Sequence, residues 1–380
     1  MIGQNWAWDH TRPRPSLQLS MESLAQELLE AIIDHVPPHH VRPCSLVARR
    51  WRKRSQQRYF GSVILSREHE AIRWYTNIPQ DPDGIPSYAR DVEIQSIRCW
   101  RDPTVLGRVL KCFSRVKTLV ICETHLPSSE VQKIVASSEF GREVTSLIFI
   151  SPRSTMPELM QLILSFPNLR ELMINSISQT EPPASIPPDK TWQKEPLQSL
   201  ELSSLHSKEM EFIALCGITS RRIDLSLGDA MIEKIIACSS ETVSELLLQD
   251  GYPPIAPMTT LPPIVQLPPL SALTTMEVTI YPGFLSARLA DFLPCIHSAP
   301  VLSSITFKYL KLTPPEDIPT SHLWNNVDKW LARLATHAKV KGGLTVVLAL
   351  WPERNLKWEE CLLEFRKAGG ELKIETGTHS

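Results

Sequence analysis

The stretch Leu197-Gln198-Ser199-Leu200-Glu201-Leu202 decides the fold of this 380-residue chain. Leu200 and Leu202 are separated by one residue, so in an extended strand they point to one face and Glu201 points to the other. Leu197 adds a third apolar position, which completes the spacing Leu-x-x-Leu-x-Leu. Similar stretches recur along the chain, and their recurrence predicts a protein built from repeated strands.

Apolar pairs with the spacing of Leu200 and Leu202 define the period of the repeat. The pairs are Val63/Leu65, Val92/Ile94, Leu119/Ile121, Leu147/Phe149, Leu172/Ile174, Leu200/Leu202, Ile223/Leu225, Leu246/Leu248, Met276/Val278 and Ile305/Phe307. Their first members lie 29, 27, 28, 25, 28, 23, 23, 30 and 29 residues apart. A period of about 27 residues indicates an array of supersecondary units.

Segments with helical periodicity lie between the pairs. They cover residues 104–113, 129–140, 156–166, 207–216, 229–238 and 286–297. Their apolar residues follow the helical repeat, as Met231 and Ile235 do. Alternation of the two periodicities predicts strand–helix units. Neither piece can bury its apolar face alone, so the units must stack on their neighbours.

This organisation resembles the leucine-rich repeat, which implies an α/β fold in the form of an irregular solenoid of strand–helix units. The chain departs from that family where an Asn is usual, three residues after the second apolar position. It has instead Thr124, Pro152, Ile177, Leu205, Gly228, Gly251, Tyr281 and Leu310. Without an Asn ladder, other backbone hydrogen bonds must hold the coils. An α/β sandwich with a parallel sheet shows the same alternation and stays open as an alternative.

The block before residue 60 has a different pattern. Ser23 followed by Gln26 predicts a capping box at the start of a helix. Pro37-Pro38 ends this helix. Its broad apolar face consists of Leu24, Leu28, Leu29, Ile32, Ile33 and Val36. A second helical stretch is expected to place Val47, Trp51 and Ser55 on one side.

Over residues 21–65 this block resembles the F-box, a small helical adaptor-docking module. The F-box pattern Leu-Pro-x-Glu-Leu-Leu is matched by Leu24-Ala25-Gln26-Glu27-Leu28-Leu29, with Ala25 in place of Pro. Its later Leu-Val-x-x-x-Trp is matched from Leu46 to Trp51. Alanine is a good helix former, so the exchange is compatible with the first helical turn. An F-box followed by degenerate leucine-rich repeats resembles the large family of fungal F-box proteins.

Four parts of the chain are expected from these patterns. Residues 1–20 are a flexible tail, 21–60 the F-box, 61–320 the degenerate repeats and 321–380 capping units. Pro-rich inserts at 178–196, 253–269 and 313–319 predict extended loops. The capping units are expected as a helix at 322–338, a strand at 344–350, a helix at 356–367 and a strand at 372–375.

Composition narrows the class of protein. The net charge of −1 suggests no affinity of the whole chain for nucleic acid or membranes. No apolar run approaches the ~18 residues of a membrane span. The eight cysteines are scattered without Cys-x-x-Cys, which predicts an intracellular protein, cytoplasmic or nuclear. The basic run of Arg49, Arg50, Arg52, Lys53, Arg54 and Arg58 suggests either a nucleic-acid or nuclear-localisation patch or, the preferred interpretation, a solvated helix face.

Motifs of catalysis are absent from the sequence. It contains no Gly-x-Ser-x-Gly, no phosphate-binding glycine loop and no His-Glu-x-x-His. His39-His40 is the only adjacent histidine pair, and neighbouring side chains point in different directions. The chain is therefore expected not to be an enzyme and to need no cofactor or metal.

The F-box resemblance implies docking onto a Skp-type adaptor of a cullin–RING ubiquitin ligase. By position in the motif, the adaptor contacts would be Leu24, Ala25, Leu28, Ile32, Leu46 and Val47. Packing within the module or against the first repeat is expected for Leu29, Ile33, Val36 and Trp51.

The repeat resemblance implies that a target protein binds on the concave side, where the residues flanking each apolar pair point. The candidate residues are Val120, Ile148, Ile150, Met173, Glu201, Asp224, Glu245 and Glu277. Two interpretations stay open. The apolar early residues grip a target while the later acids select a basic partner, or a Pro-rich insert such as 178–196 folds over the apolar patch and buries it.

These expectations combine into one function. The chain is expected to be a substrate-recognition subunit of an SCF-type cullin–RING ubiquitin ligase that recruits an unknown protein. The alternative is a protein-binding repeat scaffold without a role in a ubiquitin ligase. An enzyme on a parallel α/β sheet is a third class of protein. The low glycine content, 14 of 380 residues, and the missing catalytic motifs disfavour it.

Overall fold

The computed structural model describes two compact units of the chain, Met1–Gly61 and Ser62–Ser380. The described residues are 24–79, 84–95, 102, 104–123, 139–177, 192, 194–226, 231–250, 266–280, 287–309, 322–337, 343–350 and 362–376. The tail at 1–20, the insert at 313–319 and most of the inserts at 178–196 and 253–269 lie outside these residues.

The described residues of the first unit form three helices, α1 (Gln26–His35), α2 (Pro38–Val47) and α3 (Arg49–Tyr59). Its core joins Leu29 and Ile33 of α1 to Trp51 of α3. As predicted, α1 ends before the two prolines: Val36 is extended, with φ −68° and ψ 129°, and Pro38 is the first residue of α2.

Two details of the predicted helices are wrong. The residue that caps α1 is Ala25, which makes no side-chain hydrogen bond. Gln26 is therefore the first helical residue and cannot complete a capping box; its Nε2 donates to Glu30 Oε1 at 3.0 Å instead. The second stretch is two helices, because Ala48 between them is extended at φ −152° and ψ 155°. This break leaves Val47 exposed while Trp51 is buried.

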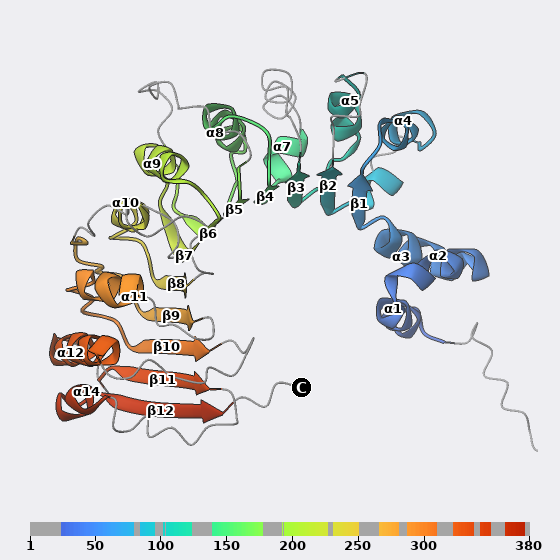
Figure 1. Cartoon of the computed structure of the whole chain (residues 1–380). Coiled ribbons are helices and arrows are strands. Elements are labelled where there is room, and N and C mark those ends of the chain that lie inside the picture. The colour runs from blue at the N-terminus through green and yellow to red at the C-terminus, as the bar shows by residue number, and fades with distance from the viewer. Residues whose placement is uncertain are drawn as a thin grey trace, which may run out of the picture. The chain divides into compact units, whose positions relative to one another are not determined.

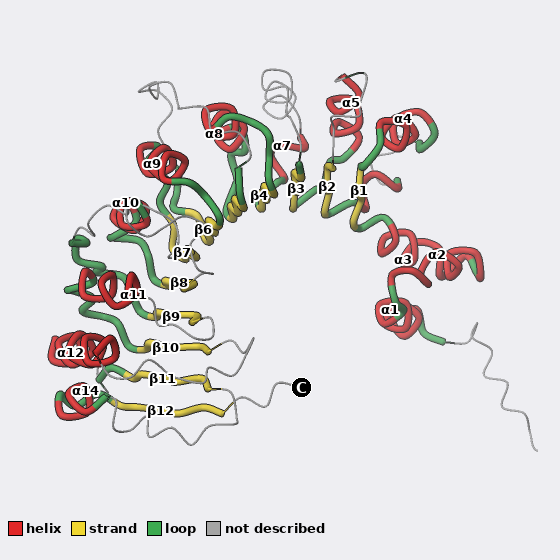
Figure 2. The backbone as a smooth tube through the Cα atoms, viewed as in Figure 1, coloured by secondary structure: helices red, strands yellow, loops and turns green. Residues whose placement is uncertain are grey.

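The second unit is built on one sheet of twelve parallel strands whose spatial order follows the chain from β1 to β12. The strands are β1 (Ser62–Leu65), β2 (Asp91–Gln95), β3 (Thr118–Cys122), β4 (Ser146–Ile150), β5 (Glu171–Asn175), β6 (Leu197–Ser203), β7 (Ser220–Ser226), β8 (Glu245–Asp250), β9 (Thr275–Ile280), β10 (Ser304–Tyr309), β11 (Thr345–Leu350) and β12 (Glu371–Thr376). Figure 2 shows these strands as one continuous row.

The described helices of this unit lie along one side of the sheet, and the strands line the other, inner side (Figure 1). They are α4 (Glu68–Thr76), α5 (Thr104–Cys112), α7 (Glu139–Glu143), α8 (Met156–Leu164), α9 (Ser207–Leu215), α10 (Ile232–Cys238), α11 (Ala287–Phe292), α12 (His322–His337) and α14 (Leu363–Lys367), with 3-10 turns η2 (Ile85–Tyr88) and η6 (Leu293–Cys295). The helix predicted at 286–297 changes to a 3-10 turn after Phe292, because Pro294 cannot continue it. Most of the segment predicted at 129–140, and residues 356–361, lie outside the described residues.

All ten predicted apolar pairs lie in strands, and the pairs stack in register. Leu172 pairs with Leu200, which pairs with Ile223, and the second members follow the same order. Val346 and Leu348 of β11 continue both columns. No member of these eleven pairs is more than 5% exposed. Burial of one such side chain stabilises a fold by about 1.5–3 kcal/mol, so the two columns form the main core of the sheet.

Backbone hydrogen bonds replace the missing Asn ladder at the carboxyl ends of the strands. Glu123, Ser151 and Ser176 each follow a strand in the left-handed conformation, with φ 46°, 48° and 57°. Their N–H groups donate to the carbonyls of Ile150, Asn175 and Ser203, at 2.9, 2.8 and 2.9 Å, each at the end of the next strand.

A second ladder runs along the amino ends of the strands. The Lys117 carbonyl accepts from the N–H groups of Thr145 and Ser146, both at 2.9 Å. Farther along, hydroxyls join the ladder: Thr274 Oγ1 donates to the Ser244 carbonyl at 2.9 Å, and Ser303 Oγ to the Thr274 carbonyl at 3.0 Å. Backbone N–H and carbonyl groups thus fix both ends of the strands, and Ser or Thr hydroxyls add hydrogen bonds at some of the amino ends.

The C-terminal units close with a side-chain cap. Asp328 of α12 is buried, and its two carboxylate oxygens accept from the N–H groups of Glu364 at 2.9 Å and Phe365 at 2.8 Å. These N–H groups belong to the first turn of α14, where a carboxylate is favourable. Leu362 and Phe365 are buried, and Leu363 between them is exposed.

The left-handed residues provide a test of the carboxyl-end ladder. Ser176→Gly is expected to stabilise the protein by about 0.5–1 kcal/mol, because glycine adopts a positive φ without the steric cost that serine incurs and keeps the same N–H donor. Ser199→Gly, in the middle of β6, is the matched control and is expected to destabilise it. Denaturant unfolding of both variants measures the difference; equal losses in the two would contradict the expectation.

Candidate functional site

Four large aliphatic side chains are exposed among the described residues of the first unit. The exposed fractions are 55% for Leu28, 42% for Ile32, 81% for Leu46 and 64% for Val47. In α1, the next residues in sequence, Leu29 and Ile33, are fully buried, so the helix divides its apolar residues between a core face and an open face. All four belong to the predicted adaptor contacts.

The remaining two predicted contacts contribute less surface. Leu24 is partly buried against the core of the unit, and Ala25 is an exposed residue with one methyl group. Two hydrogen bonds hold this end of α1 beside the start of α3: Arg50 Nη2 donates to the Leu24 carbonyl at 2.9 Å, and Gln26 Nε2 donates to the Arg50 carbonyl at 3.3 Å. The start of α1 therefore lies near the junction that follows Val47.

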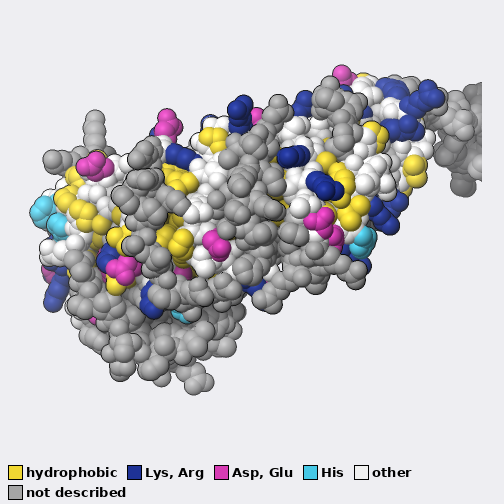
Figure 3. Space-filling view, turned by 90° about the horizontal axis from the view of Figure 1, so that it is seen from above, with side chains coloured by type: hydrophobic (Ala, Val, Ile, Leu, Met, Phe, Trp, Pro, Cys, Tyr) yellow, Lys and Arg dark blue, Asp and Glu magenta, His cyan; other side chains and the backbone are white. Residues whose placement is uncertain are grey.

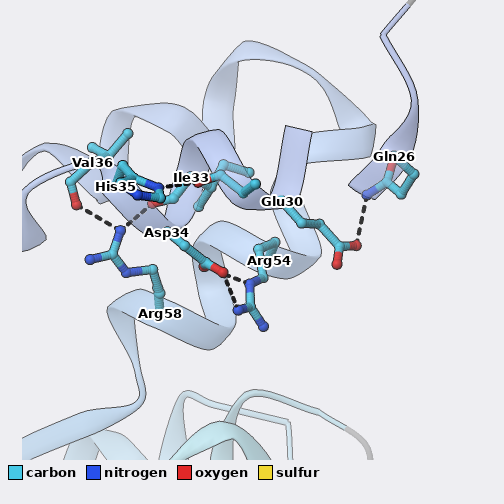
Figure 4. A network of polar contacts seen from close by, with 9 residues as sticks. Gln26, Glu30, Ile33, Asp34, His35, Val36, Arg54 and Arg58 are labelled. Atoms are coloured by element: carbon cyan, nitrogen blue, oxygen red, sulfur yellow. Dashed lines mark hydrogen bonds and ion pairs between the residues drawn. The ribbon is translucent and has the colours of Figure 1, made fainter. Parts of the chain in front are cut away.

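Arginines of the basic run bind α1 to α3 (Figure 4). Arg54 forms two hydrogen bonds to the Asp34 carboxylate, at 2.8 and 2.5 Å, and this bonding holds the pKa of Asp34 below its usual value. Arg58 Nη1 donates to the carbonyls of Ile33 and Val36 at the end of α1. Together with Arg50, these residues recur every four positions, so they lie on one face of α3.

Half of the basic run therefore has a structural role that the sequence analysis missed. The recurrence at every fourth position was the signal that could have found it. Arg49, Arg52 and Lys53 remain exposed. Figure 3 shows Lys and Arg side chains interspersed with hydrophobic ones on the visible face of the molecule.

All eight candidate residues for target binding lie on the inner side of the sheet, opposite the apolar pairs. Val120, Ile148, Met173, Glu201, Asp224 and Glu277 occupy one row, because the register pairs each with the middle residue of the neighbouring strand. Leu247 stands in this row between the last two. Ile150 and Glu245 lie in the rows on either side. Along the row, the surface changes from apolar on β3–β5 to acidic on β6 and β7.

Glu201 and Asp224 are direct neighbours in this row, and both carboxyls are partly buried. Burial, and then the charge of Asp224, raises the pKa of Glu201. Burial also raises the pKa of Asp224, against the hydrogen bond that Gln249 Nε2 donates to its Oδ1 at 3.0 Å. The pair thus carries two negative charges that the fold does not fully compensate.

Other acids of the inner side are ion-paired. Lys308 Nζ lies 2.7 Å from Glu277 Oε1, and Arg222 Nη1 lies 3.7 Å from Glu245 Oε2. Both pairs join neighbouring strands and are partly exposed, so each is worth about 0–1 kcal/mol. Arg222 was not predicted as a site residue, although it precedes the apolar Ile223 just as Glu245 precedes Leu246.

A hollow of about 620 Å³ opens on the inner side between β4 and β8. It is lined by Ser146, Ile148, Glu171, Leu172, Met173, Gln198, Ser199, Glu201, Arg221, Arg222, Asp224, Ser244 and Glu245. Five of the eight predicted target-binding residues are among them, while Val120, Ile150 and Glu277 lie elsewhere on the same side. The hollow is a candidate binding site with an apolar and an acidic part.

Metal-binding geometry is not found in the described part of the chain: no group of three or more His, Cys, Asp or Glu side chains is placed to hold an ion. None of the helices within the described residues combines the length and apolarity needed to cross a bilayer. Comparisons of the chain with known protein families and with curated proteins found no match.

The Arg58 contacts predict a local stability effect. Arg58→Met is expected to weaken protection of the α1 amides by about 1–3 kcal/mol, because two carbonyls lose a charged donor. Arg52→Met, an exposed residue of the same helix, is the control and is expected to have no effect. Amide hydrogen exchange of α1 measures both variants, and equal protection of α1 in the two would argue against the role of Arg58.

The acid pair predicts a dependence of stability on pH. A carboxyl whose pKa is higher in the folded state disfavours folding when ionised. Glu201→Gln plus Asp224→Asn is therefore expected to be more stable than the wild type at pH 7. The advantage should shrink as the pH falls through the raised pKa values toward the ordinary values of 4.5 and 3.8.

The control for this variant is Asp102→Asn. Hydrogen bonds from Thr104 lower the pKa of Asp102, so neutralising it is expected to reduce stability at pH 7. Unfolding curves in denaturant between pH 4 and pH 7 measure both variants. A destabilised double variant at pH 7 would contradict the proposed repulsion between the two acids.

Proposed function

We propose that this chain is the substrate-recognition subunit of an SCF-type cullin–RING ubiquitin ligase, with α1–α3 as the F-box and the strand–helix units as degenerate leucine-rich repeats. The observation that carries the proposal is the open apolar face of the first unit: Leu28, Ile32, Leu46 and Val47 are exposed, although the unit has its own core. An exposed apolar patch on a small helical unit marks a protein-binding site. In the F-box pattern these are the positions that would face a Skp-type adaptor.

The energetics favour an adaptor interface that is centred on these four residues. Full burial of a Leu, Ile or Val side chain is worth about 1.5–3 kcal/mol. Each of the four side chains is about half exposed or more, so burying all four against an adaptor would supply on the order of 5 kcal/mol. Association itself costs about 4–15 kcal/mol, so further contacts are needed for a firm complex. Of the other predicted contacts, Leu24 is already packed on the unit's core and Ala25 is small.

The assignment of the second unit to the leucine-rich repeats is supported by its topology. The spatial order of the strands follows the chain, every neighbour is parallel, and the described helices lie on one side. A parallel sheet in an α/β sandwich has helices on both faces, so this arrangement favours stacked repeats over that alternative. The usual Asn ladder is missing, but the two backbone ladders take its place.

In this role the chain catalyses no bond formation. It would hold a target protein on the repeats while the adaptor and the cullin complex bring the ubiquitin-transfer machinery close, which raises the effective concentration of the two. Such a receptor acts inside the cell, in the cytoplasm or the nucleus.

Co-purification of the full chain with a Skp-type adaptor tests the proposal. The wild type is expected to bind, and Leu28→Asp plus Leu46→Asp to lose binding, because a charge would replace two exposed apolar contacts. Neither position belongs to the core, so the variant is expected to fold. The matched control is Leu215→Asp plus Leu363→Asp, two exposed leucines of the second unit, which should bind as the wild type does.

Absence of binding by the wild-type chain would overturn the proposal. The alternative, a protein-binding repeat scaffold without a ligase role, would then stand, and the exchange of the usual Pro for Ala25 would be one mark of an F-box that has lost its partner.

A further inference from the structure

The hollow between β4 and β8 brings two kinds of surface together. Ile148 and Met173 form its apolar part, and Glu201 and Asp224 form the adjoining acidic part. These four residues are successive partners in the register, so they follow one another across the sheet. Three strand spacings of about 4.8 Å separate the first from the last, about 14 Å in all. This length fits a few residues of an extended peptide.

The charge of the lining favours a cation. It contains four carboxylates (Glu171, Glu201, Asp224 and Glu245) and two guanidiniums (Arg221 and Arg222), which leaves a net charge of −2. Arg222 lies beside Glu245, at 3.7 Å. Within the described residues, Glu201 has no hydrogen-bond donor and Asp224 has the neutral amide of Gln249. Burial raises the pKa of both acids while the charge of Arg222 lowers it, so the acid pair keeps a negative charge that its surroundings compensate only in part.

We propose that this hollow binds an extended segment of a partner protein in which a Lys or Arg side chain lies next to an apolar side chain. The cation inserts between Glu201 and Asp224, and the apolar side chain packs on Ile148 and Met173. The inference rests on the proposed function in one respect: if the chain is a ligase subunit, the bound segment belongs to a protein that is to be ubiquitinated. The site itself belongs to the sheet and does not involve α1–α3.

A bound cation would relieve the strain of the acid pair. Two carboxylates on neighbouring strands repel each other, which is one cause of the raised pKa of Glu201. A guanidinium or ammonium between them offsets both charges through charge-assisted hydrogen bonds in a partly desolvated place. The same negative charge disfavours phosphate groups, so a nucleic acid does not fit this hollow.

The position of the acid pair also explains why selectivity is expected here and not elsewhere in the row. Farther along, Glu277 is already paired with Lys308 at 2.7 Å. In the other direction, Val120, Ile148 and Met173 offer only apolar side chains, which discriminate little between apolar groups of different shape. The boundary between the two regions, at β5 and β6, is where a partner must satisfy both requirements at once.

The test uses the purified full chain and a positional-scanning library of twelve-residue peptides as the probe. The library is expected to show enrichment of Lys or Arg beside Leu, Ile, Met or Phe. In the best peptide, citrulline in place of Arg, or Gln in place of Lys, should weaken binding about tenfold. Glu201→Gln plus Asp224→Asn should weaken binding of the cationic peptide by about the same factor. The same double variant should have little effect on binding of the neutral peptide, because that peptide already lacks the cation that interacts with the two acids.

The matched control is Glu371→Gln plus Glu375→Gln, which removes two negative charges from the same sheet at exposed positions of β12, outside the hollow. It should bind the cationic peptide as the wild type does. No enrichment in the library would overturn the proposal, as would an equal loss in the control or an equal effect of the double variant on both peptides.

Adaptor binding is measured separately on the same preparation. Lost adaptor binding with retained peptide selection would overturn the proposed ligase role and leave this site, and the reverse result would overturn this site alone.

Discussion

The in-register stacking of the apolar pairs is the constraint on which the second unit depends. Side chains alternate along a strand, so a slip of one residue between neighbouring strands would turn a whole pair from the core to the solvent. From β1 to β11 no such slip occurs, although the spacing of the pairs varies from 23 to 41 residues. The segments that connect successive strands, on the helix side of the sheet, differ in length and account for this variation in spacing. Register, and not repeat length, is what the sequence preserves.

This constraint also explains how the unit dispenses with the Asn ladder. The left-handed residues Glu123, Ser151 and Ser176 fix the carboxyl ends of three strands, and the carbonyls that precede the strands fix the amino ends. Both ladders are made mainly of backbone atoms. They demand little of the side chains, which is why the positions that usually hold Asn contain residues as different as Pro152 and Leu205.

The parts of the structure that follow from side-chain period could be predicted, and those that follow from backbone choices could not. The ten strand centres were predicted because alternation leaves two apolar residues at a fixed spacing. The break at Ala48 was missed because alanine is a good helix former and no Gly or Pro marks the place. The positive φ of Ser176 was missed for a similar reason, since glycine is the usual signal. Cross-strand pairs such as Lys308 and Glu277 need the register before they can be seen.

The candidate site shows the same division. Its central residues Ile148, Met173, Glu201 and Asp224 were predicted, because any residue between two members of a pair must face the inner side, whereas Arg222 was not. Their grouping was not, because only the register places Met173 beside Glu201 and Glu201 beside Asp224. Since the core lies on the other side and both ladders are made mainly of backbone atoms, the inner positions carry little of the burden of folding. Two adjacent carboxylates with raised pKa values disfavour folding rather than aid it. The acids on β6 and β7 therefore need a reason other than stability, and recognition of a cationic partner supplies one.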